Sequence, residues 1–298
     1  MEAYMEKKNA EIQAINRQTF SQRLKSYKRS PLSLILLILV SMSALITVMT
    51  LLFLLAYILI KGVPYLTPDL FAWEYNSENV SLMPALINTI IMTGLSLIIA
   101  APLGIFSAIY LVEYAKRGNK LVALIRITAE TLSGIPSIVY GLFGFLLFAV
   151  TFQWSYTILG GALTLAIMIL PLIMRTAEEA LKSVPDSYRE ASFGLGAGKL
   201  RTIFKIVLPS AVPGILSGVI LATGRVVGET AALLFTAGTI AKVAGLMDSG
   251  RTLAVHMYAL SSEGLYMNQM YATGVILMLI VLLINGCSGM IAKKIAKK

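Results

Sequence analysis

"RTAEEALKSVPDSYREASFGLGAGKLRTIFKIVLPSAVPG", residues 175–214, is the charged stretch on which the interpretation of this chain depends. Pro185 interrupts a helical pattern, because proline cannot donate the hydrogen bond that continues a helix. Ser187 and Glu190 have the spacing of a capping box, which predicts that a short new helix starts there. Gly196 then allows a sharp turn. We therefore predict two short helical pieces separated by a turn.

The sequence on both sides of this stretch is strongly apolar. Of the 298 residues 57% are hydrophobic and 13% are charged, whereas a soluble domain usually carries about a quarter charged residues. Windows of about 20 apolar residues, the length that crosses a bilayer, predict six membrane spans. The chain is therefore expected to be an all-α polytopic membrane protein with six transmembrane helices, at about 32–60, 85–113, 133–152, 157–174, 210–240 and 268–291.

The positive charges predict the orientation of these spans. Of the 25 Lys and Arg residues, 21 fall in the N-terminal segment, the second loop, the fourth loop and the C-terminus. Because loops rich in Lys and Arg stay on the cytoplasmic side, we expect both termini and the fourth loop to be cytoplasmic, in a prokaryotic inner membrane. The predicted organisation is a basic segment on the inner leaflet (1–31), a first helix (32–60), an outer loop (61–83), a transmembrane core (84–291) with a cytoplasmic loop at 182–209, and a basic tail (292–298).

Several kinds of chemistry are not expected in this chain. "GAGKL" (196–200) resembles part of a nucleotide-binding loop, but Phe193 replaces the first glycine and Leu200 follows the lysine. With one cysteine and one histidine, Cys287 and His256, the chain has too few ligands for a zinc or haem centre. We expect no bound cofactor or metal and no enzymatic activity; His256 and Arg251 are assigned to a solvated outer loop.

The fourth loop carries a recognisable signature. Glu190-Ala191-Ser192, three residues, Gly196, nine residues and then Ile206-x-Leu208-Pro209 resemble the E-A-A-x3-G-x9-I-x-L-P signature of ABC importer permeases, with Ser192 in place of the second alanine. The resemblance implies a type I importer fold whose loop forms a coupling helix that docks on a separate ATPase. The residues it implies for this coupling are Glu190, Ala191, Ser192, Gly196, Ile206, Leu208 and Pro209.

Two further stretches narrow the resemblance: "AIYLVEYAK…LIRITAETLSGIPSIVYGLFGF" (108–145) and "ATGRVVGETAALLFTAG" (222–238). Together with the loop they resemble the PstA family of phosphate-uptake permeases over about residues 84–290. This implies transport of inorganic phosphate, with a homologous PstC-like permease, two PstB-like ATPase subunits that bind ATP and Mg²⁺, and an extracytoplasmic PstS-like binding protein. Alternatives are a permease for another oxyanion, such as sulfate or molybdate, or a secondary transporter.

Arg225 and Glu229 stand in the middle of the predicted fifth span, where a charge costs about 2.5–3.5 kcal/mol on insertion scales. Their i, i+4 spacing predicts an ion pair on one helix face. A guanidinium matches two oxygens of an oxyanion, so we interpret Arg225 as a contact of the passing anion and Glu229 as the group that keeps this contact transient. A purely structural ion pair is the alternative.

Arg126 and Glu130 repeat this spacing just before the third span. An exposed or interfacial pair is one interpretation, and a role in the inner gate of the substrate pathway is the other. Ser133, which follows them, is assigned to the same pathway because Pro136 is expected to bend the helix there. Gly141 and Gly144 are interpreted as residues of close helix packing.

Overall fold

The structure is a computed structural model that describes residues 31–116 and 118–296, with the side chains of 287–288 and 291–296 left out. Residues 1–30 of the predicted basic segment on the inner leaflet (1–31) lie outside the described residues, as does the end of the basic tail. The chain divides into two units, one up to Tyr57 and one from Ile58 onward, and each is considered by itself.

The first described element is α3, Pro31–Gly62, one continuous helix of 32 residues. Its residues are apolar around the whole circumference, and Lys61 in the last turn is its only charged residue. A helix of this kind suits a lipid environment, because all its backbone polar groups are bonded within the helix. The predicted first span at 32–60 is thus confirmed as a helix of spanning length.

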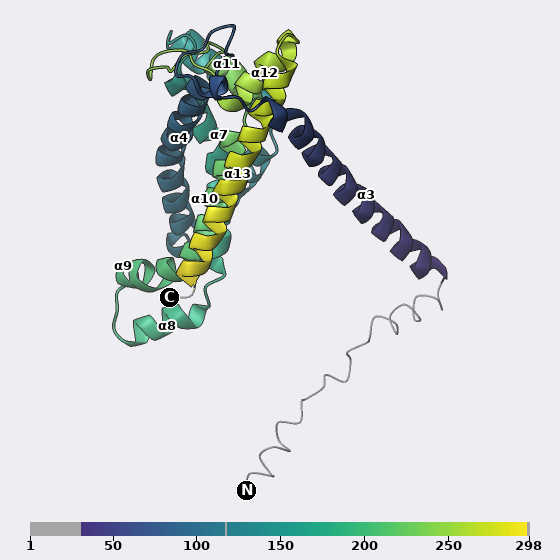
Figure 1. Cartoon of the computed structure of the whole chain (residues 1–298). Coiled ribbons are helices and arrows are strands. Elements are labelled where there is room, and N and C mark those ends of the chain that lie inside the picture. Colours follow the sequence, from purple (N-terminus) through teal and green to yellow (C-terminus); the bar gives the residue numbers. More distant parts are fainter. Residues whose placement is uncertain (1–30, 117, 297–298) are drawn as a thin grey trace. The chain divides into compact units, whose positions relative to one another are not determined.

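The second unit is built on four long helices. They are α4 (Met83–Ile109), continued by a π-helical turn η4 (Tyr110–Tyr114), then α7 (Ile158–Lys182), α10 (Leu208–Val227) and α13 (Met267–Ala296). α7 packs against both α4 and α10, and α10 packs against α13 (Figure 1). Close packing is built on small residues: a Cβ on Gly104 of α4 would lie 2.9 Å from the side chain of Ile173, so the two backbones approach closely there.

The predicted third span is present as a bent pair of helices. α5 (Lys120–Ser133) ends at Gly134, and α6 (Ser137–Gly144) begins after Pro136 and continues as the π-helical segment η5 (Phe145–Thr151). The axes of the two parts differ by 101°, which places the bend where Pro136 was expected to produce it. In the described part of the chain five helices are long and apolar enough to cross a membrane, and this pair gives the sixth if it is one span.

The predicted fifth span, 210–240, is wrong in its second half. α10 ends at Val227, and Gly228 is its C-cap residue. The chain then forms the short helix α11 (Ala231–Thr236), which packs against α6 and α7. Cβ atoms on Gly141 and Gly144 would meet α11 at Ala232 and Thr236, and Gly144 would also meet Thr164 of α7. The interpretation of both glycines as close-packing residues is confirmed.

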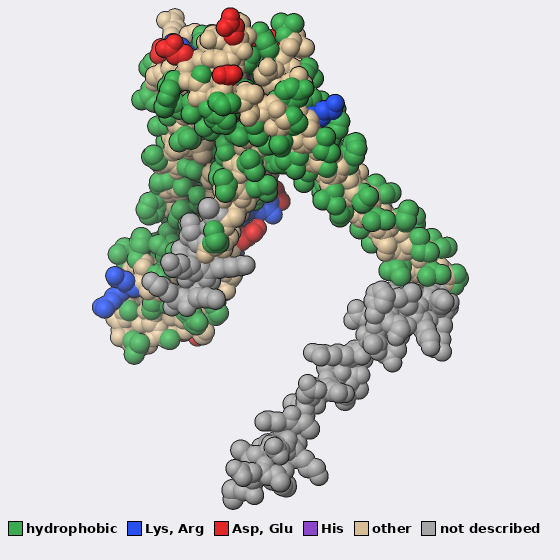
Figure 2. All heavy atoms as spheres, viewed as in Figure 1, with side chains coloured by type: hydrophobic (Ala, Val, Ile, Leu, Met, Phe, Trp, Pro, Cys, Tyr) green, Lys and Arg blue, Asp and Glu red, His purple; other side chains and the backbone are tan. Residues whose placement is uncertain are grey.

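Short helices define the two ends of this unit. At one end lie α8 (Asp186–Gly194), α9 (Lys199–Thr202) and a π-helical segment η6 (Ile203–Val207) that runs into α10; we call it the α8–α9 end. The α11–α12 end carries α11, α12 (Leu253–Glu263) and two short 3-10 turns, η2 (Val63–Tyr65) and η3 (Pro68–Phe71). In Figure 2 hydrophobic side chains cover the helices between the two ends, and acidic side chains gather at the α11–α12 end.

Candidate functional site: the α8 loop and the charged groups of the bundle

The loop between α7 and α10 forms the two helical pieces and the turn that the sequence predicts. Gly196 lies between them with φ +82°, a conformation that L side chains rarely adopt, so its role in the turn is confirmed. The predicted capping box is wrong in detail. α8 begins at Asp186, one residue before Ser187, and Pro185 occupies the N-cap position, from which it makes no side-chain hydrogen bond.

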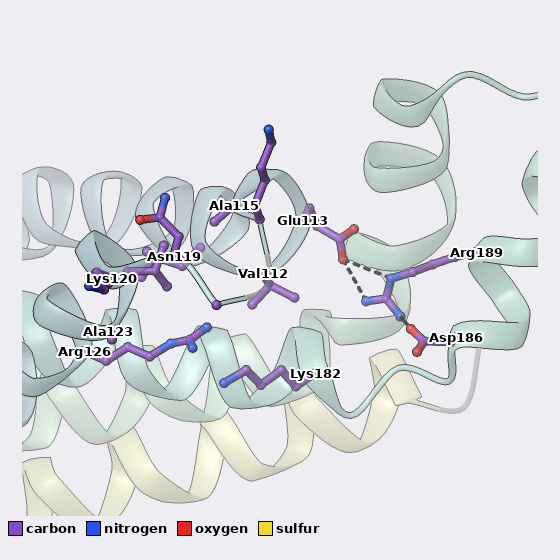
Figure 3. A pocket seen from close by; sticks show the side chains of 14 residues that line it. Val112, Glu113, Ala115, Asn119, Lys120, Ala123, Arg126, Lys182, Asp186 and Arg189 are labelled. Carbon is purple, nitrogen blue, oxygen red and sulfur yellow. Dashed lines mark hydrogen bonds and ion pairs between the residues drawn. The ribbon is translucent and has the colours of Figure 1, made fainter.

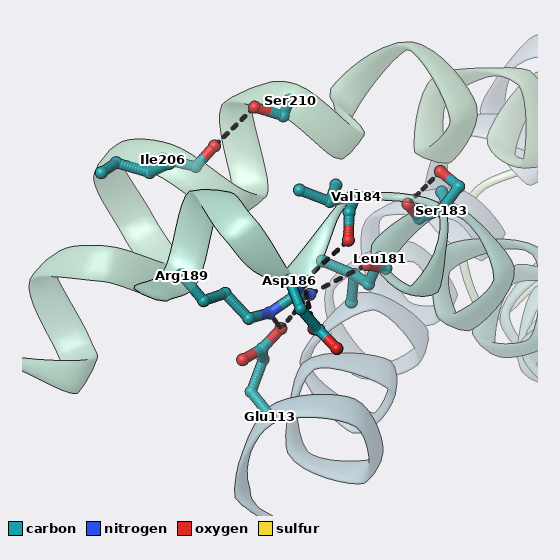
Figure 4. Close-up of polar contacts among 9 residues, drawn as sticks. Glu113, Leu181, Ser183, Val184, Asp186, Arg189, Ile206 and Ser210 are labelled. Atoms are coloured by element: carbon teal, nitrogen blue, oxygen red, sulfur yellow. Dashed lines mark hydrogen bonds and ion pairs between the residues drawn. The ribbon is translucent and has the colours of Figure 1, made fainter. Parts of the chain in front are cut away.

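Arg189 of α8 attaches this helix to the rest of the bundle. Its guanidinium binds Glu113 in η4 through Nε and Nη2, at 3.1 and 2.7 Å, and Asp186 through Nη1 at 3.2 Å (Figure 3). The same guanidinium donates to the carbonyl oxygens of Val184 and Leu181 at the end of α7, at 2.8 and 3.0 Å (Figure 4). Arg189 therefore fixes α8 to both α4 and α7.

The signature residues of the loop divide into exposed and buried positions. Glu190, Ala191 and Gly196 are exposed, together with the apolar side chains of Tyr188 and Leu195. Ser192 is buried, and its hydroxyl lies 2.8 Å from the hydroxyl of Thr202, which joins α8 to α9. Serine in place of the usual alanine thus makes a hydrogen bond that alanine could not make. Ile206 and Leu208 are half-buried and Pro209 is exposed.

The charged residues of α5 pair with α7 and not with each other. Arg126 Nε lies 2.6 Å from Oε1 of Glu178, and Lys182 Nζ lies 2.6 Å from the same oxygen. Glu130 lies 3.5 Å from Arg175 in an exposed pair. Because α5 runs along the charged end of α7, these partners are nearer than the i, i+4 neighbour, and the expected Arg126–Glu130 pair is wrong. Arg175 also pairs with Glu179.

Arg225 and Glu229 are separated by the end of α10. Of the ion pairs between described residues, none joins these two, and the predicted pair on one helix face is wrong. The carboxylate of Glu229 accepts a hydrogen bond from the N–H of Ala232 at 3.2 Å, in the first turn of α11, where a carboxylate is favourable. Arg225 lines a pocket of about 430 Å³ between α7, α10 and α13. Its other lining residues are Leu172, Leu221, Gly224, Val281 and Asn285.

Ser133 lies at the bend between α5 and α6. It is half-buried, and its hydroxyl donates to the carbonyl of Ala129 at 3.0 Å within α5. The structure therefore places the predicted pathway residues in three separate surroundings. Arg126, Glu130 and Ser133 belong to α5, Arg225 lines the pocket on α10, and Glu229 supports α11.

Two residues assigned to a solvated loop are buried instead. His256 in α12 is 0% exposed and Arg251 is 4% exposed. The guanidinium of Arg251 lies 4.7 Å from the ring centroid of Tyr75, and the ring of His256 meets Tyr75 edge-on at 6.1 Å. Burial, and then the charge of Arg251, lower the pKa of His256 from its usual 6.5 to about 3. The sequence contains no signal for this burial beyond the apolar residues around His256.

Glu113, Arg189 and Glu178 are not among the site residues predicted from the sequence. The signal in the sequence that could have indicated the Glu113–Arg189 pair is the position of Glu113, a carboxylate at the end of an apolar span. These charges connect the end of α4, α5, α7 and α8.

Residues 100–297 match the family described as binding-protein-dependent transport system inner membrane component. The chain belongs to this family. A probable ABC transporter permease protein, YqgI of Bacillus subtilis, is 36% identical over 226 residues, covering 70% of this chain and 76% of the relative. The phosphate transport system permease protein PstA of Haemophilus influenzae is 32% identical over 270 residues, which cover 89% of this chain and 95% of the relative.

Solved structures show that the family resemblance extends to the fold. A bacterial alginate ABC transporter, in complex with a periplasmic protein bound to an alginate pentasaccharide, contains a chain with a TM-score of 0.66 at 18% identity, and the match covers 92% of this chain and 98% of that one. A chain of the MetNI methionine ABC transporter in an inward-facing conformation gives a TM-score of 0.58 at 21% identity. This inner membrane component therefore has the fold of ABC importer permeases.

Proposed function

We propose that this chain is the permease subunit of an ATP-driven importer of inorganic phosphate. The observation that carries the proposal is the 32% identity to PstA of H. influenzae, in a match that covers 89% of the present chain. The α8 loop and its signature support it. A homologous permease would complete the pathway, two separate ATPase subunits would bind ATP and Mg²⁺, and an extracytoplasmic binding protein would deliver the anion. The chain itself breaks no bond in phosphate and requires no cofactor of its own.

We place the transporter in the inner membrane of a prokaryotic cell. The distribution of charge supports an orientation in which the α8–α9 end faces the cytoplasm. That end carries nine of the Lys and Arg residues that the structure describes, which favours the cytoplasmic side. They are Lys116, Lys120, Arg126, Arg175, Lys182, Arg189, Lys199, Arg201 and Lys205. The described end of α13 would then also face the cytoplasm.

In this orientation α8 is the coupling helix. Tyr188 is exposed on α8, and Leu195, which directly follows the helix, is 90% exposed. Arg189 binds the helix to the rest of the bundle. An apolar patch bordered by the charge of Glu190 suits a docking cleft on another protein. Closure of the ATPase pair would move α8 as a rigid body, and the bonds of Arg189 would carry this motion to α4 and α7.

Arg225 is the group that we assign to the passing anion. It is half-buried within the hydrophobic length of the bundle, where an unpaired guanidinium is costly unless it faces water or an anion, and it opens into a pocket of about 430 Å³. Since Glu229 binds the backbone of α11, we assign Glu229 to the positioning of α11 beside α10. Among the described residues no carboxylate forms an ion pair with Arg225, so its guanidinium can bind phosphate and release it again.

The test is uptake of radiolabelled phosphate into vesicles that contain the complete transporter. ATP is supplied on the side of the membrane that the ATPase subunits face. Arg225→Gln is expected to lower uptake about tenfold or more, because a charge-assisted contact contributes about 1.5–3 kcal/mol. Lys242→Gln, which removes an exposed charge at the α11–α12 end, is the matched control and should transport normally. Wild-type uptake by the Arg225→Gln transporter would refute the assignment of Arg225.

The same vesicles are then tested for uptake of sulfate and of molybdate. If either anion is taken up in place of phosphate, the chain is a permease for another oxyanion. If uptake persists in the absence of the ATPase subunits, the chain is a secondary transporter and the role of α8 is different.

A further inference from the structure

A cavity of about 610 Å³ lies at the α8–α9 end, away from Arg225. Figure 3 shows that its walls come from the end of α4 with η4, from the loop and first turns of α5, and from the junction of α7 with α8. Its lining residues include the segment Leu111–Glu113 and, from the α4–α5 loop, Lys116 and Lys120. The cavity therefore lies between the α4–α5 region and the junction of α7 with α8.

Positive charge exceeds negative charge around this cavity. Five basic side chains line it: Lys116, Lys120, Arg126, Lys182 and Arg189. Three carboxylates contact these groups. Glu113 and Asp186 bind Arg189, and Glu178 is shared by Arg126 and Lys182. After this pairing two positive charges remain without a counter-charge from the described residues.

The excess charge lies on the two lysines of the α4–α5 loop. Neither Lys116 nor Lys120 takes part in an ion pair or a side-chain hydrogen bond with another described residue, and both are exposed. The 14-residue helix α5 begins at Lys120, and Asn119 caps it by accepting from the N–H of Leu121. The positive end of the helix dipole thus adds to the charge of the two ammonium groups.

We propose that this cavity binds a phosphoryl group, either as free inorganic phosphate or as part of the headgroup of an anionic phospholipid. A phosphoryl dianion matches two uncompensated positive charges, and its oxygens can accept from several ammonium and guanidinium donors at once. The cavity volume is sufficient for either form. The group would lie between the α4–α5 loop, which carries Lys116 and Lys120, and Lys182 at the end of α7.

A bound phosphoryl group would restrain α8. It would connect the α4–α5 loop to the end of α7, directly beside the contact of Arg189 with Glu113, and so oppose any separation of these walls. Its occupancy would therefore lower the rate at which α8 completes its movement. This regulatory consequence rests on the proposed coupling role of α8, whereas the binding itself does not depend on what the transporter carries.

The experiment measures how strongly Lys116 and Lys120 are protected from an amine-acylating reagent in the purified, complete transporter. One arm uses detergent and adds inorganic phosphate, with sodium chloride at equal ionic strength as the reference. The other arm uses nanodiscs that contain phosphatidylglycerol or only phosphatidylcholine, without added phosphate. We expect a severalfold decrease in acylation of both lysines in at least one arm.

Variants separate a built site from general screening of charge. Lys182→Gln, on the opposite wall, should abolish most of the protection of Lys116 and Lys120. Arg201→Gln combined with Lys205→Gln removes two exposed charges from the same end that do not line the cavity, and protection should persist. Arg225→Gln should also leave protection unchanged, which distinguishes this site from the proposed pathway even if the pathway assignment fails.

Each result decides the proposal. Protection by phosphate in detergent identifies the free anion as the occupant, and protection by phosphatidylglycerol alone identifies the lipid headgroup. The proposal is overturned if neither arm protects the lysines, if chloride protects them equally, or if the Arg201/Lys205 variant loses protection as fully as Lys182→Gln. Circular dichroism and gel filtration of each variant establish that the transporter remains assembled.

Discussion

Arg189 and Glu113, 76 residues apart in the chain, are joined by two hydrogen bonds of 3.1 and 2.7 Å from one guanidinium to one carboxylate oxygen. Their side chains are 14% and 8% exposed. The pair connects α8, which we propose to contact the ATPase, with the end of the helix α4. Bonds of this kind hold direction as well as distance, so they are suited to transmit a displacement.

The first prediction concerns this pair. Arg189→Met leaves the carboxylate of Glu113 partly buried and unpaired, at a cost of about 2–4 kcal/mol. Glu113→Gln should cost less, because Arg189 keeps its contacts with Asp186 and the carbonyls of Val184 and Leu181. We expect ATP hydrolysis to continue while phosphate uptake per ATP decreases strongly. The double variant should lose less than the sum of the two single variants. Strictly additive effects in uptake and thermal stability would show that the pair does not act as a unit.

The second prediction concerns the turn in the α8 loop. Gly196 has φ +82° and open space around its Cα, so Gly196→Arg strains the backbone and places a charged chain on the proposed docking face. Transport and association with the ATPase should be lost, while membrane insertion remains. Gly198→Arg, which also has open space but an ordinary φ of −71°, is the control for added bulk. Equal loss in both variants would argue that surface bulk, and not the turn, is responsible.

The third prediction concerns the packing of α7 on α10. A Cβ on Gly218 would collide with the side chain of Thr176, and overpacking of this kind costs about 1–3 kcal/mol. Gly218→Ala should therefore lower the melting temperature of the purified transporter. Gly94→Ala, in α4 with nothing within 4 Å, should leave it unchanged or slightly higher, because alanine favours a helix. A reversed order of the two melting temperatures would contradict the described packing.

The fourth prediction concerns pH and His256. Because its pKa is lowered from 6.5 to about 3, the folded protein binds fewer protons than the unfolded chain between these values. Stability is therefore complete above pH 6.5 and decreases as the pH falls toward 3, by about 2 kcal/mol at pH 5. Arg251 and Tyr75 face the imidazole, and the charge of Arg251 adds to the cost of protonation.

His256→Phe keeps a ring against Tyr75 and removes the titrating group. Thermal unfolding of both proteins between pH 5 and pH 8 tests the prediction, and the difference in melting temperature should grow in favour of the variant as the pH falls. Parallel curves for the two proteins would mean that the imidazole is accessible to solvent.

The sequence predicted those features that depend on local composition and spacing. Most of the apolar segments, the turn at Gly196, the bend near Pro136 and the close packing of Gly141 and Gly144 agree with the structure, whereas the fifth segment ends early, at Val227. Errors arose where a choice between partners had to be made. Spacing of i, i+4 suggested Arg126–Glu130, but the end of α7 offers Glu178 and Arg175 at shorter range, and sequence spacing contains no information on which neighbour is nearer.

The sequence by itself therefore determined that this chain spans a membrane and carries a loop of the ABC importer type, because apolar length and proline and glycine positions act locally. Only the tertiary structure decided which charges meet. It ended α10 at Val227 and gave the carboxylate of Glu229 to the backbone of α11, it buried Arg251 and His256, and it brought Arg189 to Glu113. Ion pairs and burial depend on the approach of distant helices, and the free energy of each pair is set by those surroundings.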